Sequence, residues 1–260
     1  GQSALMIGQW NEGIKEVTHL PFSKLAGAKN ALPNEPEVVN ENDNYYIYMV
    51  LNGNNEAIKI DWKTRKIIWR ASTGVAPYGI AIANGKAYVS NWAGRKAVDS
   101  LRERAGVPWG LAYTDPRTGA TAEGTVTVLN SKDGGFITEI ETGLHPNVIR
   151  AAKDQKYVYV ANGSSDAISV ISTTGNQVTE TIPVGMLQNK NNYVGSVPNG
   201  LALNADNTQL YVSNGLDNAI AVVHLGKNAS THGKGRSHVN GYIPTEAFPS
   251  GLQLIQDHLV

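Results

Sequence analysis

The sequence predicts an all-β chain built from repeated units of about four strands, and two patterns carry this prediction. Runs of β-branched and aromatic residues alternate with turn residues along the chain, as in the Tyr-Val-Tyr-Val run at 157–160, which suits a half-buried strand. A Tyr-Val-x-Asn pattern recurs at residues 88–91, 159–162 and 211–214. Recurrence of one strand pattern within a chain is typical of repeat proteins.

The repeat is clearest at residues 156–171, which predict a β-hairpin. Apolar runs flank the sequence Asn-Gly-Ser-Ser-Asp at 162–166, and these residue types favour chain reversal. The same hairpin aligns without a gap at residues 45–60 and occurs again at 210–223, while residues 86–94 hold its first half. Four copies make this a repeat protein.

A second signature precedes each of the last three hairpins and also closes the chain. It is a proline, usually a glycine two residues later, and then apolar alternation, which predicts a turn leading into a strand. It occurs at residues 77–81, 146–150, 198–202 and 249–253. A further β-rich piece follows the hairpin, as at 177–185, so each unit holds about four strands.

The spacing of the units predicts a β-propeller of four-stranded blades. The shortest interval, from Asn52 to Asn91, is close to the roughly 40–50 residues of one blade, and longer intervals indicate insertions. We expect a single propeller domain over 1–260, with degenerate or partial blades in 1–43 and recognisable blades in 44–260. The largest insertion, residues 96–123, is expected to form a long loop on one face.

Composition excludes several classes of site. The chain has 260 residues with 22 basic and 22 acidic side chains, so no net field attracts nucleic acid, and no nucleic-acid partner is expected. The absence of cysteine excludes disulfides, thiolate metal sites and a cysteine nucleophile. No apolar run reaches the length of a membrane-spanning helix, so no transmembrane segment is expected.

The repeat motifs resemble those of a known family. Tyr-Val-Ser-Asn at 88–91, Tyr-Val-Ala-Asn at 159–162 and Tyr-Val-Ser-Asn at 211–214 resemble the YVTN repeats of seven-bladed β-propellers of the surface-layer-like, or YncE-like, family. The insertion, with Asp-Pro-Arg-Thr-Gly at 115–119, resembles more narrowly the propeller portion of bacterial proteins that carry a downstream phosphatase-like domain. The resemblance implies an exported protein, periplasmic or at the cell surface, with a catalytic domain beyond the propeller.

The motifs are too few for seven blades. They amount to about three complete repeats, a partial one at the end and one or two degenerate ones at the start, whereas a seven-bladed ring needs about 300 residues. We therefore expect an incomplete seven-bladed propeller. Either this chain is a piece of a longer protein, or the missing strands come from elsewhere.

Most polar residues of the repeats are expected to be structural. The repeat asparagines Asn52, Asn91, Asn162 and Asn214 recur at equivalent positions, so we expect each to bond its own backbone at a turn. The repeat tyrosines are expected to pack between blades. The six histidines show no metal-ligand spacing, and no metal or other cofactor is predicted.

Candidate binding residues come from the insertion and from the proline signatures. Aromatic and guanidinium groups gather in or beside the insertion, where they would stack on a carbohydrate, pair with an anion, or dock a neighbouring domain. His145 precedes a proline signature, a connection that rings the mouth of the channel in propellers. The predicted ligand-binding residues are Tyr78, Trp92, Arg95, Trp109, Arg117, His145, Arg150 and Asn199.

The leading hypothesis for function is a non-catalytic propeller scaffold that binds a protein, a small molecule or a carbohydrate. The alternative is a hydrolase of the lactonase type, with a channel site built around His145, Arg150 and Asn199. No Gly-x-Ser-x-Gly or phosphate-loop motif and no distinguished carboxylate pair supports catalysis, so no catalytic residue is predicted. A third hypothesis is a structural surface-layer component.

Overall fold

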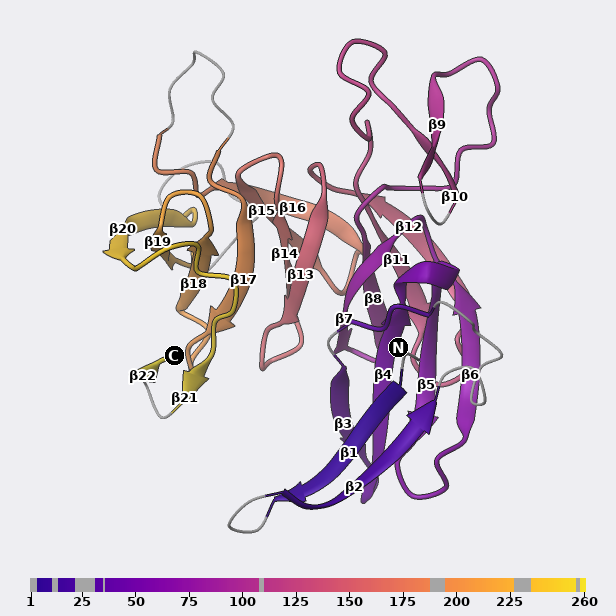
Figure 1. Cartoon of the computed structure of the whole chain (residues 1–260). Helices are drawn as coiled ribbons and strands as arrows, with labels where there is room; N and C mark the ends of the chain where they lie inside the picture. Colours follow the sequence, from indigo (N-terminus) through magenta and orange to yellow (C-terminus); the bar gives the residue numbers. More distant parts are fainter. Residues whose placement is uncertain are drawn as a thin grey trace.

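The computed structural model describes residues 4–10, 14–21, 31–34, 36–107, 110–187, 195–226, 235–255 and 258–260. Its main elements are four four-stranded antiparallel sheets that follow one another along the chain. Figure 1 shows the four sheets side by side in chain order. The prediction of an all-β chain with four-stranded units is therefore confirmed. None of the described sheets closes on itself, and the described strands do not make up seven blades.

Each sheet is an antiparallel meander whose strands pair in the order in which they follow along the chain. The first sheet holds β3 (Glu37–Glu41), β4 (Asn44–Leu51), β5 (Glu56–Asp61) and β6 (Ile67–Ser72), with a short 3-10 turn at Asn52–Asn54. The second holds β7 (Pro77–Ala83), β8 (Lys86–Asn91), β11 (Thr125–Asn130) and β12 (Phe136–Glu141). The third holds β13 (Pro146–Ala151), β14 (Tyr157–Asn162), β15 (Ala167–Ser172) and β16 (Gln177–Pro183). The fourth holds β17 (Pro198–Leu203), β18 (Gln209–Asn214), β19 (Ala219–His224) and β20 (His238–Pro244).

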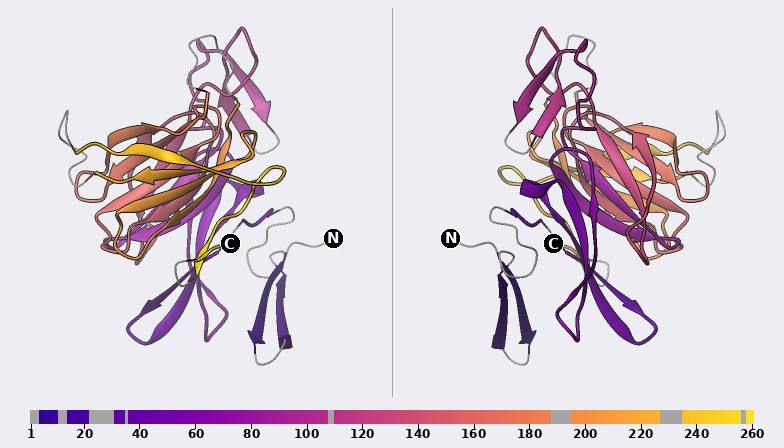
Figure 2. Two further views of the ribbon diagram at one scale, coloured as in Figure 1. Left: turned by 90° about the vertical axis from the view of Figure 1, so that its left-hand side faces the viewer. Right: turned by 90° about the vertical axis from the view of Figure 1, so that its right-hand side faces the viewer.

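Three further hairpins flank these sheets. They are β1 (Ala4–Trp10) with β2 (Ile14–Pro21), β9 (Arg104–Val107) with β10 (Gly110–Tyr113), and the short pair β21 (Leu254–Ile255) and β22 (His258–Leu259). The expected loop at 96–123 thus contains a hairpin, and Figure 2 shows it projecting beyond the four-stranded sheets. The boundary expected between residues 43 and 44 falls inside the first sheet, between β3 and β4.

The first strand of each sheet lies toward the middle of the assembly. β7 contacts β13, β13 contacts β17, and β3 contacts β7. Three of these strands begin at the predicted proline signatures, at Pro77, Pro146 and Pro198. The fourth signature, at 249–253, forms no strand, although Leu252 lies beside Gly200 of β17.

The core lies between neighbouring sheets. One cluster, including Tyr48, Val50 and Leu129, packs the first sheet against the second. A second cluster joins the second and third sheets, and a third joins the third and fourth. The middle strands therefore have neighbours on both faces, which explains why their sequences are continuous apolar runs rather than alternating ones.

Candidate functional site

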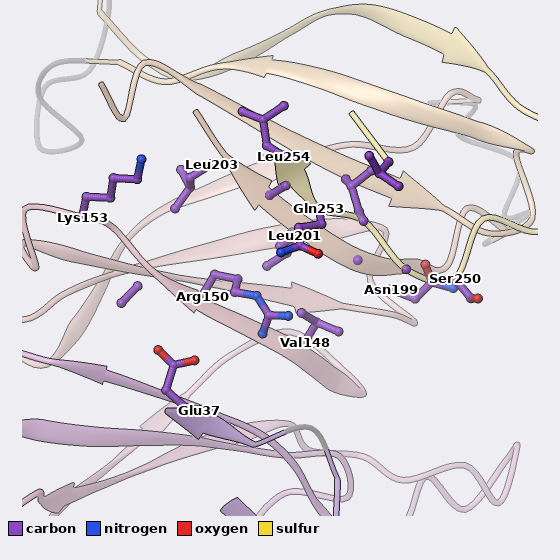
Figure 3. A pocket seen from close by; sticks show the side chains of 16 residues that line it. Glu37, Val148, Arg150, Lys153, Asn199, Leu201, Leu203, Ser250, Gln253 and Leu254 are labelled. Carbon is purple, nitrogen blue, oxygen red and sulfur yellow. The ribbon is translucent and has the colours of Figure 1, made fainter. Parts of the chain in front are cut away.

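The inner strands enclose a cavity that is the candidate functional site. Its volume is about 760 Å³, and Figure 3 shows side chains from three sheets and from the C-terminal segment that line it. A smaller space of about 170 Å³ shares Arg150, Asn199 and Ser250 with it and extends the lining to Tyr78. The site is thus built from strands that are far apart in the sequence.

Residues of β13 and β17 line much of the cavity. On β13, Val148 and Arg150 line it, whereas the intervening Ile149 is fully buried in the cluster between the second and third sheets. On β17 the lining runs over five consecutive residues, 199–203, so alternation along a strand does not by itself select the lining residues.

The lining combines charged, amide and apolar groups. Glu37 from β3 contributes a carboxylate, while Arg150 and Lys153 contribute cations. The Arg150 guanidinium donates a hydrogen bond to the backbone carbonyl of Ile149 at 3.1 Å. The Asn199 Oδ1 accepts one from the Ser213 hydroxyl at 2.7 Å, which orients the amide. Such a lining suits a small polar ligand better than an apolar one.

The structure brings three of the predicted site residues together. Tyr78 on β7, Arg150 on β13 and Asn199 on β17 all line the smaller space. His145 lines neither of these two spaces, so the expected grouping of His145 with Arg150 and Asn199 is absent.

His145 belongs instead to a contact between the insertion and the third sheet. Its Nε2 lies 2.6 Å from the Thr121 Oγ1, its Nδ1 bonds the Ser164 hydroxyl, and its ring stacks on Trp92 with centroids 4.0 Å apart. Burial lowers the pKa of His145 below its ordinary value, so the ring is neutral at pH 7. A neutral ring donates from one nitrogen and accepts at the other, and hydroxyl groups suit both roles.

The arginines of the insertion are engaged with carboxylates. Arg95 pairs with Glu123 at 2.9 Å and also with Glu141, and Arg117 pairs with its neighbour Asp115 at 3.1 Å. Arg95 thereby joins the insertion to the second sheet, whereas the Arg117 pair is confined to one exposed turn. Both guanidinium groups are less able to bind an external anion while these pairs persist. Trp109, the remaining predicted residue, lies outside the described residues.

The repeat asparagines are structural, but their partners differ from the prediction. Asn91, Asn162 and Asn214 are fully buried at the ends of β8, β14 and β18. Their side-chain amides donate to neighbouring strands or connections, for example from Asn162 to the Ser169 hydroxyl at 2.9 Å. The expectation that each bonds its own backbone is therefore wrong. Burial beside other strands offers these amides closer acceptors than their own turn does.

The sequence prediction missed part of the cavity lining. Glu37 directly follows Pro36, as Tyr78 follows Pro77 and Asn199 follows Pro198, so this proline is the signal that could have marked β3 as an inner strand. Val148 and Ser250 lie inside proline signatures, and Val148 lies two positions before Arg150 on the same strand face.

The described residues lack two further kinds of feature. They contain no group of three or more His, Asp or Glu side chains that would hold a metal ion. None of their helices has the length and apolar character needed to cross a membrane.

Comparisons with known proteins support the fold alone. No protein-family model matches the chain, and no curated protein matches it in sequence. The structure is similar to that of a functionally unknown protein from Desulfotomaculum acetoxidans DSM 771, with a TM-score of 0.55 and 9% identity over 86% of this chain and 62% of that one. It is also similar to the computationally designed Ika8 protein, with a TM-score of 0.53 and 10% identity over 87% of this chain and 54% of that one. The chain therefore spans between half and two thirds of the length of these two structures.

Proposed function

We propose that the chain is part of a YVTN-type, seven-bladed β-propeller that serves as an exported, non-catalytic binding module. The repeated Tyr-Val-x-Asn strands and the four consecutive four-stranded sheets support the propeller assignment. Export and a downstream catalytic domain rest on the family resemblance of the motifs.

The observation that carries the binding role is the convergence of three predicted residues on one polar cavity. Tyr78, Arg150 and Asn199 come from three different sheets, yet they line one continuous space. A concave site with a few converging polar groups is the usual form of a small-molecule site.

The lining favours a small anion that also carries hydroxyl groups, such as a sugar acid. Arg150 and Lys153 supply positive charge that favours a carboxylate. Asn199, Ser250 and Gln253 add groups that bond hydroxyls. Glu37 makes one part of the lining negative, so a ligand that carries negative charge at every position is disfavoured.

The test compares three probes by isothermal titration calorimetry and thermal unfolding. Gluconate carries both a carboxylate and hydroxyls, glucose only hydroxyls, and inorganic phosphate only charge. We expect gluconate to bind and to raise the melting temperature, because a ligand that binds the folded state stabilises it. Arg150→Met should weaken this binding at least tenfold.

Arg117→Met is the matched control, because Arg117 is an exposed arginine outside both spaces. It should bind gluconate like the unaltered chain. Failure of all three probes to bind, or unchanged binding by the Arg150→Met variant, would contradict the proposal. The hydrolase alternative stays a prediction. The contacts of His145 with Thr121, Ser164 and Trp92 do not favour it.

A further inference from the structure

Two histidines of the fourth sheet lie directly opposite each other on neighbouring strands. His224 ends β19, His238 begins β20, and the two are partners in the antiparallel register. Their rings are 5.3 Å apart between centroids, with planes inclined by 50°. Both residues are exposed.

The pair lies on the face of the sheet turned away from the core. Val223 and Val239, their neighbours on β19 and β20, pack into the cluster between the third and fourth sheets. Because alternate residues point to opposite faces, the two imidazoles stand on the other face. Solvent therefore reaches the space between them.

The ring separation matches that of a metal-bound pair. Two imidazoles that bind one tetrahedral Zn²⁺ at roughly 2.0–2.1 Å have ring centres about 5 Å apart. The observed 5.3 Å between ring centroids is close to this separation.

One further contact favours the tautomer of His238 that has a lone pair on Nε2. The Nδ1 of His238 lies 3.3 Å from the Arg236 carbonyl oxygen, which only accepts, so Nδ1 carries the proton. Nε2 then keeps its lone pair. Metal-binding histidines commonly show this arrangement, in which the second nitrogen is held by a carbonyl or carboxylate.

We propose that His224 and His238 form a surface site for a divalent transition-metal ion. Imidazole pairs bind Zn²⁺, Ni²⁺ and Cu²⁺ in preference to Mg²⁺ or Ca²⁺, which favour oxygen. Gln209 lies beside His224 on β18, but its amide oxygen already accepts the Tyr211 hydroxyl at 2.8 Å. Water or groups of a second molecule complete the coordination, so the ion is exchangeable and can bridge to a partner.

The test titrates the full chain with zinc chloride by isothermal titration calorimetry at pH 7.5. All proteins carry His232→Asn, because His232 lies between the two strands in sequence and is outside the described residues. We expect one zinc ion per chain. His224→Asn or His238→Asn should each weaken binding at least tenfold, and His258→Asn, which alters another exposed histidine, should leave it unchanged.

A second readout needs no change to the pair. Magnesium chloride should give no saturable binding. The proposal is overturned if no saturable zinc binding is seen in the His232→Asn background, or if binding survives removal of either histidine in variants with unchanged circular dichroism spectra.

Discussion

At the scale of single residues, two of the repeat asparagines, Asn91 and Asn162, each lie against a glycine in the connection that precedes their own sheet. A Cβ on Gly74 would come within 2.7 Å of the Asn91 Cγ, and one on Gly143 within 2.8 Å of the Asn162 Cγ. Real Cβ atoms do not approach other atoms so closely. Glycine at 74 and 143 therefore leaves room for the buried amides, and at 74 also for the Gly94 carbonyl.

This close approach predicts the effect of one methyl group. Gly143→Ala should lower the free energy of unfolding by about 1–3 kcal/mol, because it overpacks the site around Asn162. Gly241→Ala is the matched control, since a Cβ there meets no atom within 4 Å. Urea denaturation measures both. Equal stability of the two variants would show that the Asn162 side chain can move aside freely.

At the scale of elements, the insertion is a hairpin anchored at its base rather than a free loop. Ala112 of β10 is fully buried in a small cluster with Val75, Ala76 and Ala93. Near the C-terminal end of the insertion, the Thr121 hydroxyl contacts the His145 ring, which directly precedes the third sheet. Arg95 pairs with Glu123 close by in the sequence. These contacts give the hairpin one orientation on the face where it projects.

Breaking the anchor should release the hairpin without unfolding the sheets. Ala112→Asp places a carboxylate in an apolar cluster without a designed partner, and this costs several kcal/mol locally. We expect faster amide hydrogen exchange in residues 97–113, measured by mass spectrometry, with the four-stranded sheets unaffected. Ala105→Asp, on the opposite strand and exposed, should change neither. Loss of protection throughout the chain would instead make the hairpin essential to the fold.

At the scale of the whole molecule, stability depends on the three interfaces between consecutive sheets. Each sheet packs against its neighbours in the chain, as in repeat proteins whose stability comes from nearest-neighbour contacts. Tyr88 packs between the second and third sheets and Tyr159 between the third and fourth, so the expected role of these two tyrosines is confirmed.

An interface mutation should therefore weaken two sheets at once. Ile149→Ala removes a fully buried side chain between the second and third sheets and should cost about 2–5 kcal/mol. Hydrogen exchange should accelerate in both of these sheets together. Ile68→Ala, on the outer strand β6 and 49% exposed, should cost less than about 1 kcal/mol. A change confined to β13 alone would contradict coupling through the interface.

The sequence by itself determined the strands, the repeated hairpin and the three proline signatures that open β7, β13 and β17. These features depend on residue type and alternation within one stretch of chain, which are local properties. It also identified Tyr78, Arg150 and Asn199, because each lies inside a signature.

Only the tertiary structure decided which of these local features meet. The cavity, the pairing of Arg95 with Glu141, and the contact of His145 with Thr121 all join residues that are far apart in the sequence. The pairing of His224 with His238 likewise depends on the register of β19 and β20. The physical reason is that alternation fixes the face on which a side chain lies, whereas the packing of one sheet against the next fixes what that face meets.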